Sequence, residues 1–307
     1  MKRIFIDGSA GTTGLSIRQR LATFSDLELL TLPDEQRRDP SARREAMEAA
    51  DVVFLCLPDA AAREAVRFLS DSRTLVIDTS TAHRTLSDWA YGFPELIGQR
   101  EKLCGATRIA NPGCHASGFL ALVSPLVREG LLSPDACLSA FSLTGYTGGG
   151  KSMIAQYEQE DRDPLLDAPR QYGLSQTHKH LPEMMQYAGL STAPCFCPVV
   201  GDFPRGMEVT VPLFAKDLRG TPDDVRALYR HIYGGPVVRY AEGCDETGFL
   251  SAASFSGRDD MEISVFGGGE RLLLVARFDN LGKGASGAAI QNMNILLGFD
   301  ETKGLYL

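Results

Sequence analysis

Short apolar runs alternate with amphipathic segments over the first third of the chain. Four runs have the length of buried strands, and they occupy residues 4–7, 27–32, 51–57 and 74–78. The segments between them carry apolar residues at helical spacing, and they occupy residues 13–24, 41–49 and 59–69. This alternation predicts a parallel sheet with helices on both faces.

The pattern changes after residue 113. Apolar and polar residues alternate in three later runs, as in antiparallel strands with one solvated face, and these runs occupy residues 208–213, 262–266 and 271–278. A strand is also predicted at 137–144 and a helix at 152–160. Another helix should begin at Thr221-Pro222, which has an N-cap residue followed by proline. We therefore expect a second domain of the α+β class, built on a mostly antiparallel sheet.

We place this second domain at residues 114–283. The closing segment 285–297 is apolar on more than one face, and we expect it to pack back onto the first domain. The first domain would then comprise residues 1–113 and a C-terminal helix at about 284–307. An open antiparallel sheet also favours a homo-oligomer, either a dimer or a tetramer.

The composition of the 307 residues restricts the choice of partners. A net charge of -8 disfavours long-range attraction to nucleic acids or anionic membranes, and no apolar run approaches membrane-spanning length. The seven cysteines are odd in number and lack a framework spacing, so we expect reduced thiols. A strand that begins within two residues of Met1 leaves no room for a signal peptide. These features predict a cytoplasmic protein that binds neither nucleic acid nor a membrane.

A glycine-rich turn follows the first predicted strand. Its residues are Gly8, Ser9, Ala10, Gly11, Thr12, Thr13 and Gly14. Between a strand and a helix, such glycines let the backbone approach a pyrophosphate, so we predict a Rossmann-like dinucleotide site; a turn used only for close packing is the alternative. Arg37 and Arg38 follow the second strand, where an acid would bind the ribose of NAD. They favour NADP over NAD, unless both arginines are merely solvated.

A second glycine-rich run, residues 145–152, reads Gly-Tyr-Thr-Gly-Gly-Gly-Lys-Ser and matches the phosphate-binding loop of nucleotide hydrolases. The parallel architecture precedes this run, however, and alternating strands follow it. Arg277 also interrupts the strand that would carry the acid of a hydrolase. We therefore rank a nucleotide hydrolase well below a dinucleotide enzyme, although Lys151 could still face a phosphate.

Cys114 lies directly before an apolar-periodic segment that reads as a helix. Unpaired N–H groups and the helix dipole at such an N-terminus favour thiolate over thiol, which makes a cysteine nucleophilic. A simply buried cysteine is the alternative. The run Asn-Pro-Gly before the thiol favours the nucleophile.

A histidine is the natural acid/base partner for a nucleophilic cysteine. His178 and His180 would share one face of an extended segment, and Glu183 follows at a predicted helix start. Satisfied structural histidines and a His-x-His-x-x-Glu metal site are alternatives, and the metal site ranks lowest. His115 could compete as base, but we expect it to point away along the helix.

Together these residues resemble the short-type N-acetyl-γ-glutamyl-phosphate reductases, which are related to aspartate-semialdehyde dehydrogenases. The resemblance extends over essentially the whole chain, through segments 5–14, 80–84, 91–96, 111–118, 145–153, 178–183, 279–284 and 291–294. One departure is His115, since a tyrosine often follows the nucleophile in relatives.

The resemblance implies reduction of N-acetyl-γ-glutamyl phosphate by NADPH to N-acetylglutamate semialdehyde and phosphate, a step of arginine biosynthesis. Cys114 would expel phosphate and form a thioester, and hydride transfer would give a thiohemiacetal oxyanion, which His180 would protonate. His178 and Glu183 would orient these groups. The backbone N–H of Cys114 is a candidate oxyanion donor.

An anionic acyl-phosphate substrate requires cations. Arg84 and Arg205 are candidates for carboxylate or phosphate, with structural ion pairs as the alternative. The matched segments further imply cofactor contacts from Ser80, Lys283 and Asn292, and substrate contacts from Asn111, Gly148 and Lys151. Another semialdehyde dehydrogenase of the aspartate type, or a non-catalytic NADP-binding sensor, remains an alternative. No metal is expected.

Overall fold

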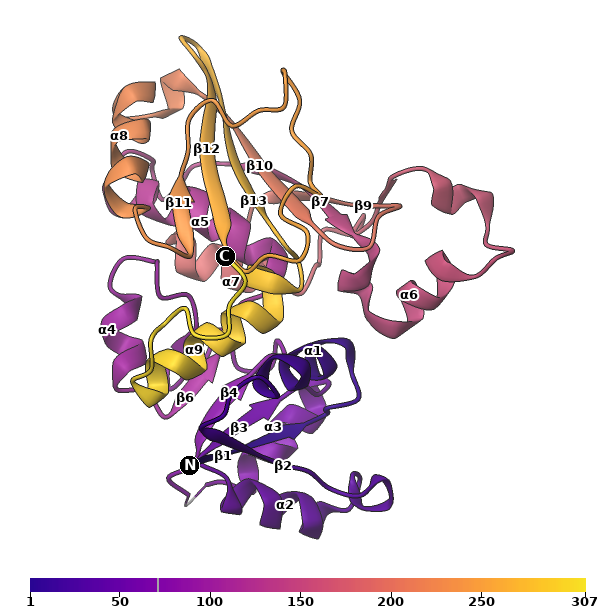
Figure 1. Ribbon diagram of the computed structural model, residues 1–307. Coiled ribbons are helices and arrows are strands. Elements are labelled where there is room, and N and C mark those ends of the chain that lie inside the picture. The colour runs from indigo at the N-terminus through magenta and orange to yellow at the C-terminus, as the bar shows by residue number, and fades with distance from the viewer. Residues whose placement is uncertain (71) are drawn as a thin grey trace. The chain divides into compact units, whose positions relative to one another are not determined.

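The computed structural model describes residues 1–70 and 72–307, which form two compact units (Figure 1). Unit 1 contains Met1–Pro94, Gly98–Pro112 and Ala285–Leu305, and unit 2 contains Glu95–Ile97, Gly113–Gly284 and Tyr306–Leu307. In the part of the chain that is described, no helix is both long enough and apolar enough to cross a membrane.

Unit 1 is built on a six-stranded sheet in which all neighbouring strands are parallel. The strands are β1 (Lys2–Asp7), β2 (Leu27–Leu30), β3 (Val52–Leu55), β4 (Leu75–Asp78), β5 (Ala90–Tyr91) and β6 (Arg108–Ala110), in the order β2-β1-β3-β4-β6-β5. The helices are α1 (Thr12–Leu21), α2 (Pro40–Ala49), α3 (Asp59–Arg67), α4 (Gln99–Cys104) and α9 (Gly287–Leu297), with a short 3-10 turn η1 (Asp34–Gln36).

Successive residues of β1 face opposite sides of this sheet, as the two-residue period of a strand requires. Ile4 packs in one apolar cluster with Ile17 of α1 and Ile290 of α9. Phe5 packs in another cluster with Met47 of α2. Helices therefore cover both faces, which confirms the predicted Rossmann-like fold class.

Unit 2 is built on a mixed seven-stranded sheet with the order β11-β12-β13-β10-β7-β9-β8. The strands are β7 (Ser139–Gly145), β8 (Arg170–Gln171), β9 (Cys195–Gly201), β10 (Met207–Phe214), β11 (Val238–Tyr240), β12 (Met261–Gly268) and β13 (Arg271–Phe278). Among the described strands of this second sheet, only the pairs β11–β12 and β7–β9 are parallel, so the predicted mostly antiparallel sheet is confirmed.

Four helices and several short turns complete unit 2. The helices are α5 (Cys114–Arg128), α6 (Gly150–Glu158), α7 (Leu181–Ala188) and α8 (Pro222–Ile232). The turns are η2 (Tyr146–Gly149), η3 (Pro164–Asp167), η4 (Ala215–Asp217) and the π-helical turn η5 (Gly282–Ser286), of which only the first three residues belong to unit 2. At α8 the Thr221 side chain accepts from the Asp224 backbone in a capping box, which confirms the predicted helix start.

Strand β9 was not predicted from the sequence. Pro198 lies within it, and a proline inside an apolar run argues against a central strand because it lacks an N–H. The structure accommodates Pro198 opposite Ser142 of the parallel neighbour β7, while the Pro198 carbonyl accepts from the backbone of Tyr172.

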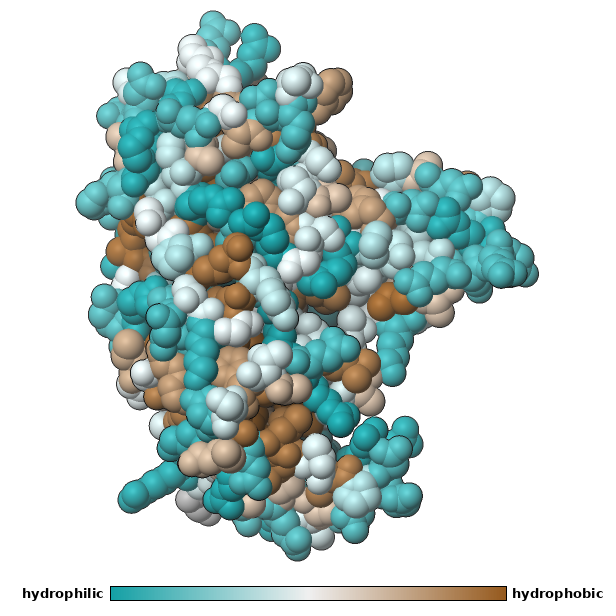
Figure 2. Space-filling model, viewed as in Figure 1, coloured by the Kyte–Doolittle hydropathy of each residue, from teal (hydrophilic) through white to brown (hydrophobic). Residues whose placement is uncertain are grey.

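The segment around α6 projects from the rest of unit 2 (Figure 1). It has a small core of its own, in which the rings of Tyr146 and Tyr157 stack 4.8 Å apart and Leu166 packs beside them. Arg162 forms two ion pairs of 2.6 Å. One is with Asp167 within the segment, and the other is with Asp202, which follows β9 and so links the segment to the sheet. Its surface is largely hydrophilic in the space-filling view (Figure 2).

Candidate active site

Cys114 is the first residue of α5, with Gly113 as its N-cap. This placement confirms that the thiol lies at a helix N-terminus, where the dipole and the unpaired N–H groups favour an anion. The helix approaches the sheet closely, since a Cβ at Gly118 would lie only 2.5 Å from Val209 of β10. Cys114 itself is partly exposed, whereas the residues that follow it are buried.

Glu183 contacts the same helix N-terminus. It lies in the first turn of α7, is 1% exposed, and accepts a hydrogen bond from the Gly113 backbone N–H at 3.2 Å. The carboxylate thus holds the residue immediately before Cys114. Pro182 is the second residue of this helix, so the helix start predicted at Pro182-Glu183 is confirmed to within one residue.

Three imidazoles come together beside this turn. The His115 ring centroid lies 5.6 Å from that of His178 and 5.5 Å from that of His180, and the two latter rings are 4.8 Å apart and nearly perpendicular. The predicted extended conformation at 178–180 is wrong, because His180 has helical dihedrals and caps α7. The backbone N–H of His180 instead donates to Nδ1 of His178 at 3.2 Å.

His115 does not point away from the site, contrary to expectation. Its ring is buried against His178 and Phe196, and its nitrogens bind Ser142 Oγ at 2.6 Å and the Tyr172 hydroxyl at 2.7 Å. Burial, and then the charges at His178 and Lys179, lower the pKa of His115 from 6.5 to about 3. The imidazole is therefore neutral at physiological pH and unsuited to hold a proton as a general acid.

Tyr172 completes this wall of aromatic rings. Burial raises the pKa of its phenol, and the charge of Cys114 raises it further. The phenol of Tyr172 therefore stays protonated at neutral pH.

The loop after β13 supports the nucleophile from the other side. A Cβ at Gly284 would lie 2.9 Å from the Cβ of Cys114 and 3.0 Å from the Asp279 carbonyl, so only glycine fits there without displacement. Asp279 is fully buried and organises the loop: it accepts from the backbone of Leu281 at 2.7 Å and forms an ion pair with Arg205, whose Nε lies 2.8 Å away.

Lys283 lies in the same loop, and its ammonium group is 2.7 Å from Oε2 of Glu95 in a buried ion pair. The side chain is 2% exposed. The resemblance placed Lys283 at the cofactor. In the structure its ammonium group pairs with the carboxylate of Glu95.

The glycine-rich run at 145–152 does not form a phosphate-binding loop. Three of its backbone N–H groups, those of Gly145, Tyr146 and Thr147, donate to carbonyls of the segment 203–206. Those N–H groups therefore cannot cradle a phosphate. Gly148 lies within η2, and Lys151 is exposed on α6.

The first glycine-rich turn, in unit 1, does form a cradle. Gly8 has φ +85°, and a Cβ there would lie 2.2 Å from the Cys56 carbonyl oxygen; at Gly14 it would lie 2.5 Å from the Gly8 carbonyl oxygen. Gly11 caps α1, and no side chain in the described residues caps that helix end. The turn thus brings bare backbone to a helix N-terminus, which suits a pyrophosphate.

A pocket of about 820 Å³ opens beside this turn. Gly8, Ser9 and Ala10 line one side of it, while Gly11, Thr12, Thr13 and Gly14 continue into α1. Four arginines also line it, Arg18, Arg37, Arg38 and Arg43. The dimensions and the positive charge suit an anionic nucleotide.

The four arginines differ in their partners. Arg43 Nη2 makes a buried ion pair with Asp7 at 2.8 Å, and burial raises the pKa of Asp7 although Arg43 opposes the shift. Arg37 pairs with Asp34 at 2.7 Å on the surface. The sequence placed Arg37 and Arg38 at a 2′-phosphate, and the structure brings both to this pocket.

Four further predicted residues lie at the carboxyl ends of β4 and β6 in unit 1. Arg84 Nε donates to the Asn111 carbonyl at 2.9 Å, and the Asn292 amide donates to Oδ1 of Asn111 at 3.0 Å. Ser80 lies nearby in the turn after β4, where its hydroxyl donates to Asp78 at 2.7 Å. None of these four lines the pocket of about 820 Å³.

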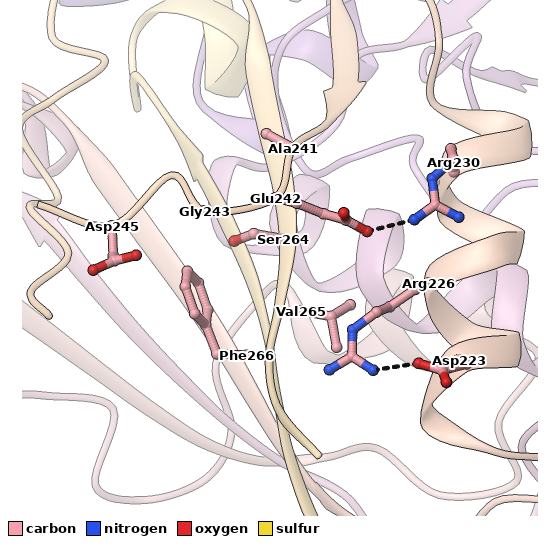
Figure 3. Close-up of a pocket in the computed structure, with 10 residues that line it drawn as sticks. All are labelled: Asp223, Arg226, Arg230, Ala241, Glu242, Gly243, Asp245, Ser264, Val265 and Phe266. Atoms are coloured by element: carbon pink, nitrogen blue, oxygen red, sulfur yellow. Dashed lines mark hydrogen bonds and ion pairs between the residues drawn. The ribbon is translucent and has the colours of Figure 1, made fainter.

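A second pocket, of about 530 Å³, lies between α8 and β12 (Figure 3). Arg226 and Arg230 project into it from α8, and they pair with Asp223 and Glu242, respectively. The pocket contains none of the predicted site residues. Among the residues that the structure describes, no cluster of three or more His, Cys, Asp or Glu side chains could hold a metal ion.

Comparison with known proteins decides the family. A chain from Brucella anthropi named N-acetyl-gamma-glutamyl-phosphate reductase is 48% identical over 306 residues, covering 96% of this chain and 98% of the relative. A chain of the same name from Brucella ovis is 47% identical, with 96% and 99% coverage. This chain belongs to the N-acetyl-γ-glutamyl-phosphate reductase family.

Family models agree with this membership of the reductase family. The model described as semialdehyde dehydrogenase, dimerisation domain, matches residues 114–280. The model described as semialdehyde dehydrogenase, NAD binding domain, matches residues 35–106. A nicotinamide dinucleotide is therefore the cofactor class, and the fit of the glycine cradle agrees with it.

Solved structures share the fold of this reductase family member. Aspartate semialdehyde dehydrogenase II from Vibrio cholerae has a TM-score of 0.72 at 15% identity, covering 97% of this chain and 99% of that one. The Candida albicans enzyme, solved with NADP, has a TM-score of 0.64 at 15% identity, with 96% and 98% coverage.

Two residues at this reductase site were missed by sequence reasoning. Gly284 was read only as part of the lysine loop, and Tyr172 lies in a polar stretch without a motif. Gly284 could have been found from its position directly after Lys283, in the segment 279–284 that resembles the reductase family. Nothing in the local sequence marks Tyr172, because its role depends on pairing between distant strands.

Proposed function

We propose that this reductase acts on N-acetyl-γ-glutamyl phosphate through a thioester on Cys114. The observation that carries the proposal is the position of Cys114 at the first turn of α5, with Glu183 on the preceding residue and the histidine cluster beside it. Unit 1 supplies the cofactor site and unit 2 the nucleophile.

The first step is acyl transfer to sulfur. The Cys114 sulfur attacks the acyl carbon, the carbon–oxygen bond to phosphate breaks, and phosphate leaves with the bonding electrons. The helix N-terminus stabilises the thiolate before attack, and backbone N–H groups there stabilise the oxyanion that develops on the carbonyl. Neutral His115 contributes no proton, so His180 takes the thiol proton.

A nicotinamide bound in unit 1 would supply the hydride that reduces the thioester on Cys114. Collapse of the resulting tetrahedral adduct re-forms the carbonyl and breaks the carbon–sulfur bond, so the proton held by His180 is better delivered to the departing sulfur than to oxygen. His178 orients His180 through the backbone hydrogen bond, and Glu183 fixes the turn that carries Cys114.

We assign NADP as the preferred form of the cofactor. Gly8, Ser9 and Ala10 would hold the pyrophosphate side, and Arg37 and Arg38 the 2′-phosphate, because all five line one pocket. Gly11, Thr12, Thr13 and Gly14 present the start of α1. Ser80, Lys283 and Asn292 would act indirectly, since each already binds a neighbouring protein group.

The anionic substrate would be bound by two arginines. Arg84 lies at the carboxyl ends of parallel strands, where ligands bind in open α/β sheets. Arg205 pairs with Asp279 through Nε, while its buried Nη2 has no hydrogen-bond partner among the described residues. That group would bind a substrate oxyanion. Asn111, Gly148 and Lys151 would contribute amide, backbone and charge contacts.

We propose that a second copy of the chain covers the open face of the unit 2 sheet. Phe141, Phe214 and Leu273 are 51%, 54% and 45% exposed, and strand register places them on one face. Helix α5 covers the opposite face, which carries Val209. We place the resulting homo-oligomer in the cytoplasm.

A steady-state assay in the reverse direction tests the substrate. N-Acetylglutamate semialdehyde and aspartate semialdehyde are each supplied with NADP and phosphate, and NADPH formation is followed. Activity with the N-acetyl compound supports the proposal. Activity with aspartate semialdehyde alone would assign the chain to the alternative dehydrogenase.

A further inference from the structure

The turn that follows β4 is fixed around one buried carboxylate. Asp78 is 0% exposed, and it accepts from the backbone N–H of Ser80 at 2.9 Å, from the Ser80 hydroxyl at 2.7 Å and from Nδ1 of His83 at 2.6 Å. The backbone of Ala82 donates in turn to Ser80 Oγ at 3.1 Å. The positions of Ser80, Ala82 and His83 are thus fixed, directly or through Ser80, by the side chain of Asp78.

The imidazole of His83 is fixed by a hydrogen bond and by ring stacking. Its Nδ1 donates to Asp78, and its ring stacks on the indole of Trp89 with centroids 4.1 Å apart and an interplanar angle of 13°. The exposed fractions of His83 and Trp89 are 4% and 6%. A stacked, hydrogen-bonded imidazole has one orientation, so the backbone that carries it is fixed as well.

Arg84 is the next residue, and its guanidinium bridges two strand ends. Nη2 donates to the Thr79 carbonyl, which follows β4, at 3.2 Å, and Nε donates to the Asn111 carbonyl, which follows β6, at 2.9 Å. The backbone of Asn111 also donates to the Asp78 carbonyl at 2.8 Å. The Arg84 guanidinium therefore lies across the carboxyl edge of the sheet. The turn at 80–83 determines the position and direction from which its side chain extends.

We infer that His83 is a positioning residue for Arg84, set by the Asp78 carboxylate and the Trp89 indole. This inference rests on the proposed role of Arg84 in binding the anionic substrate. Binding of an anion by Arg84 does not itself require a histidine at position 83. The contribution of His83 is to fix the direction in which the Arg84 side chain leaves the backbone.

The test uses reverse-direction kinetics on the full chain. His83→Phe keeps the stacking on Trp89 and removes the bond to Asp78, whereas His83→Asn keeps a donor near the Nδ1 position and removes the stacking. We expect H83F to raise the KM for phosphate or semialdehyde roughly tenfold with little change in kcat, as for lost uniform binding, and H83N to recover most of that loss. Trp89, the only tryptophan, reports the local fold by fluorescence.

A double variant separates positioning from a merely structural role. In an Arg84→Gln background, H83F should cause no further rise in KM, because coupled residues are non-additive. Independent, multiplying effects would overturn the inference, and so would a wild-type KM for H83F. If H83F does not fold, His83→Gln, whose amide nitrogen lies nearer the Nε2 position, replaces it. A normal KM for R84Q alone contradicts the proposed role of Arg84 instead.

Discussion

Oε2 of Glu183, from the first turn of α7, lies 3.2 Å from the backbone nitrogen of Gly113 and accepts its hydrogen bond. Two helix N-termini therefore share one buried carboxylate, and Cys114 is the next residue along α5. The nucleophile is held by a residue that does not itself take part in bond making.

Replacing this carboxylate should lower both stability and rate. Glu183→Ala leaves a buried N–H unsatisfied, which costs about 1–3 kcal/mol of unfolding free energy. Glu183→Gln retains an acceptor and should behave more like the parent chain. Urea denaturation and single-turnover acylation measure the two effects, and equal rates for both variants would contradict the positioning role.

Cys114→Ser should abolish turnover while leaving cofactor binding intact. A serine hydroxyl is not ionised by a helix dipole as a thiol is, so we expect a loss of roughly 10³-fold or more in kcat. Mass spectrometry of the parent chain, quenched with substrate in the absence of cofactor, should detect the acyl adduct on Cys114. Cys104→Ser, at an exposed thiol outside the site, is the matched control.

Gly284→Ala should displace the nucleophile. The added methyl group would meet the Cys114 Cβ at 2.9 Å, and such overpacking costs about 1–3 kcal/mol. A Cβ at Gly268, by contrast, would meet no atom within 4 Å, so Gly268→Ala is the control. The rate of thiol alkylation should change at Gly284 alone; unchanged alkylation and turnover there would exclude the contact.

His115 should make the free energy of unfolding depend on pH. Its pKa is about 3 in the folded chain and 6.5 ordinarily, so the unfolded chain takes up a proton first as pH falls. Stability from this group is present above pH 6.5 and declines towards pH 3, by up to about 1.4 kcal/mol per pH unit. Unfolding of His115→Gln, measured over the same range, should show a shallower slope.

Arg37 and Arg38 should set the choice between cofactors. Because a hydrogen bond to a charged group contributes about 1.5–3 kcal/mol, the double alanine variant should raise the KM for NADPH roughly tenfold or more. The KM for NADH should hardly change. Arg67→Ala, on an exposed part of α3 away from the pocket, controls for net charge. Parallel losses with both cofactors would remove the arginines from the 2′-phosphate site.

Local patterns predicted the parallel sheet, the helix behind Cys114 and the start of α8, because periodicity and capping depend on neighbouring residues. The letters of residues 145–152 match a phosphate loop, and in the sequence only the order of the surrounding elements argued against that function. There the segment 203–206, distant in sequence, occupies the backbone N–H groups. The orientation of His115 was misjudged because its partners are distant in sequence: Ser142 lies in β7, and Tyr172 directly follows β8.

Unit 1 takes part of its core from the far end of the chain. Ile290 and Met293 of α9 pack in the same cluster as Ile4 and Phe54, from the first strands. During synthesis that face of the parallel sheet therefore has α1 packed on it but stays partly uncovered until α9 has left the ribosome. The order of synthesis makes the docking of α9 the step that completes the cofactor-binding unit, and a chain truncated at residue 284 should have one face of its first sheet only partly covered.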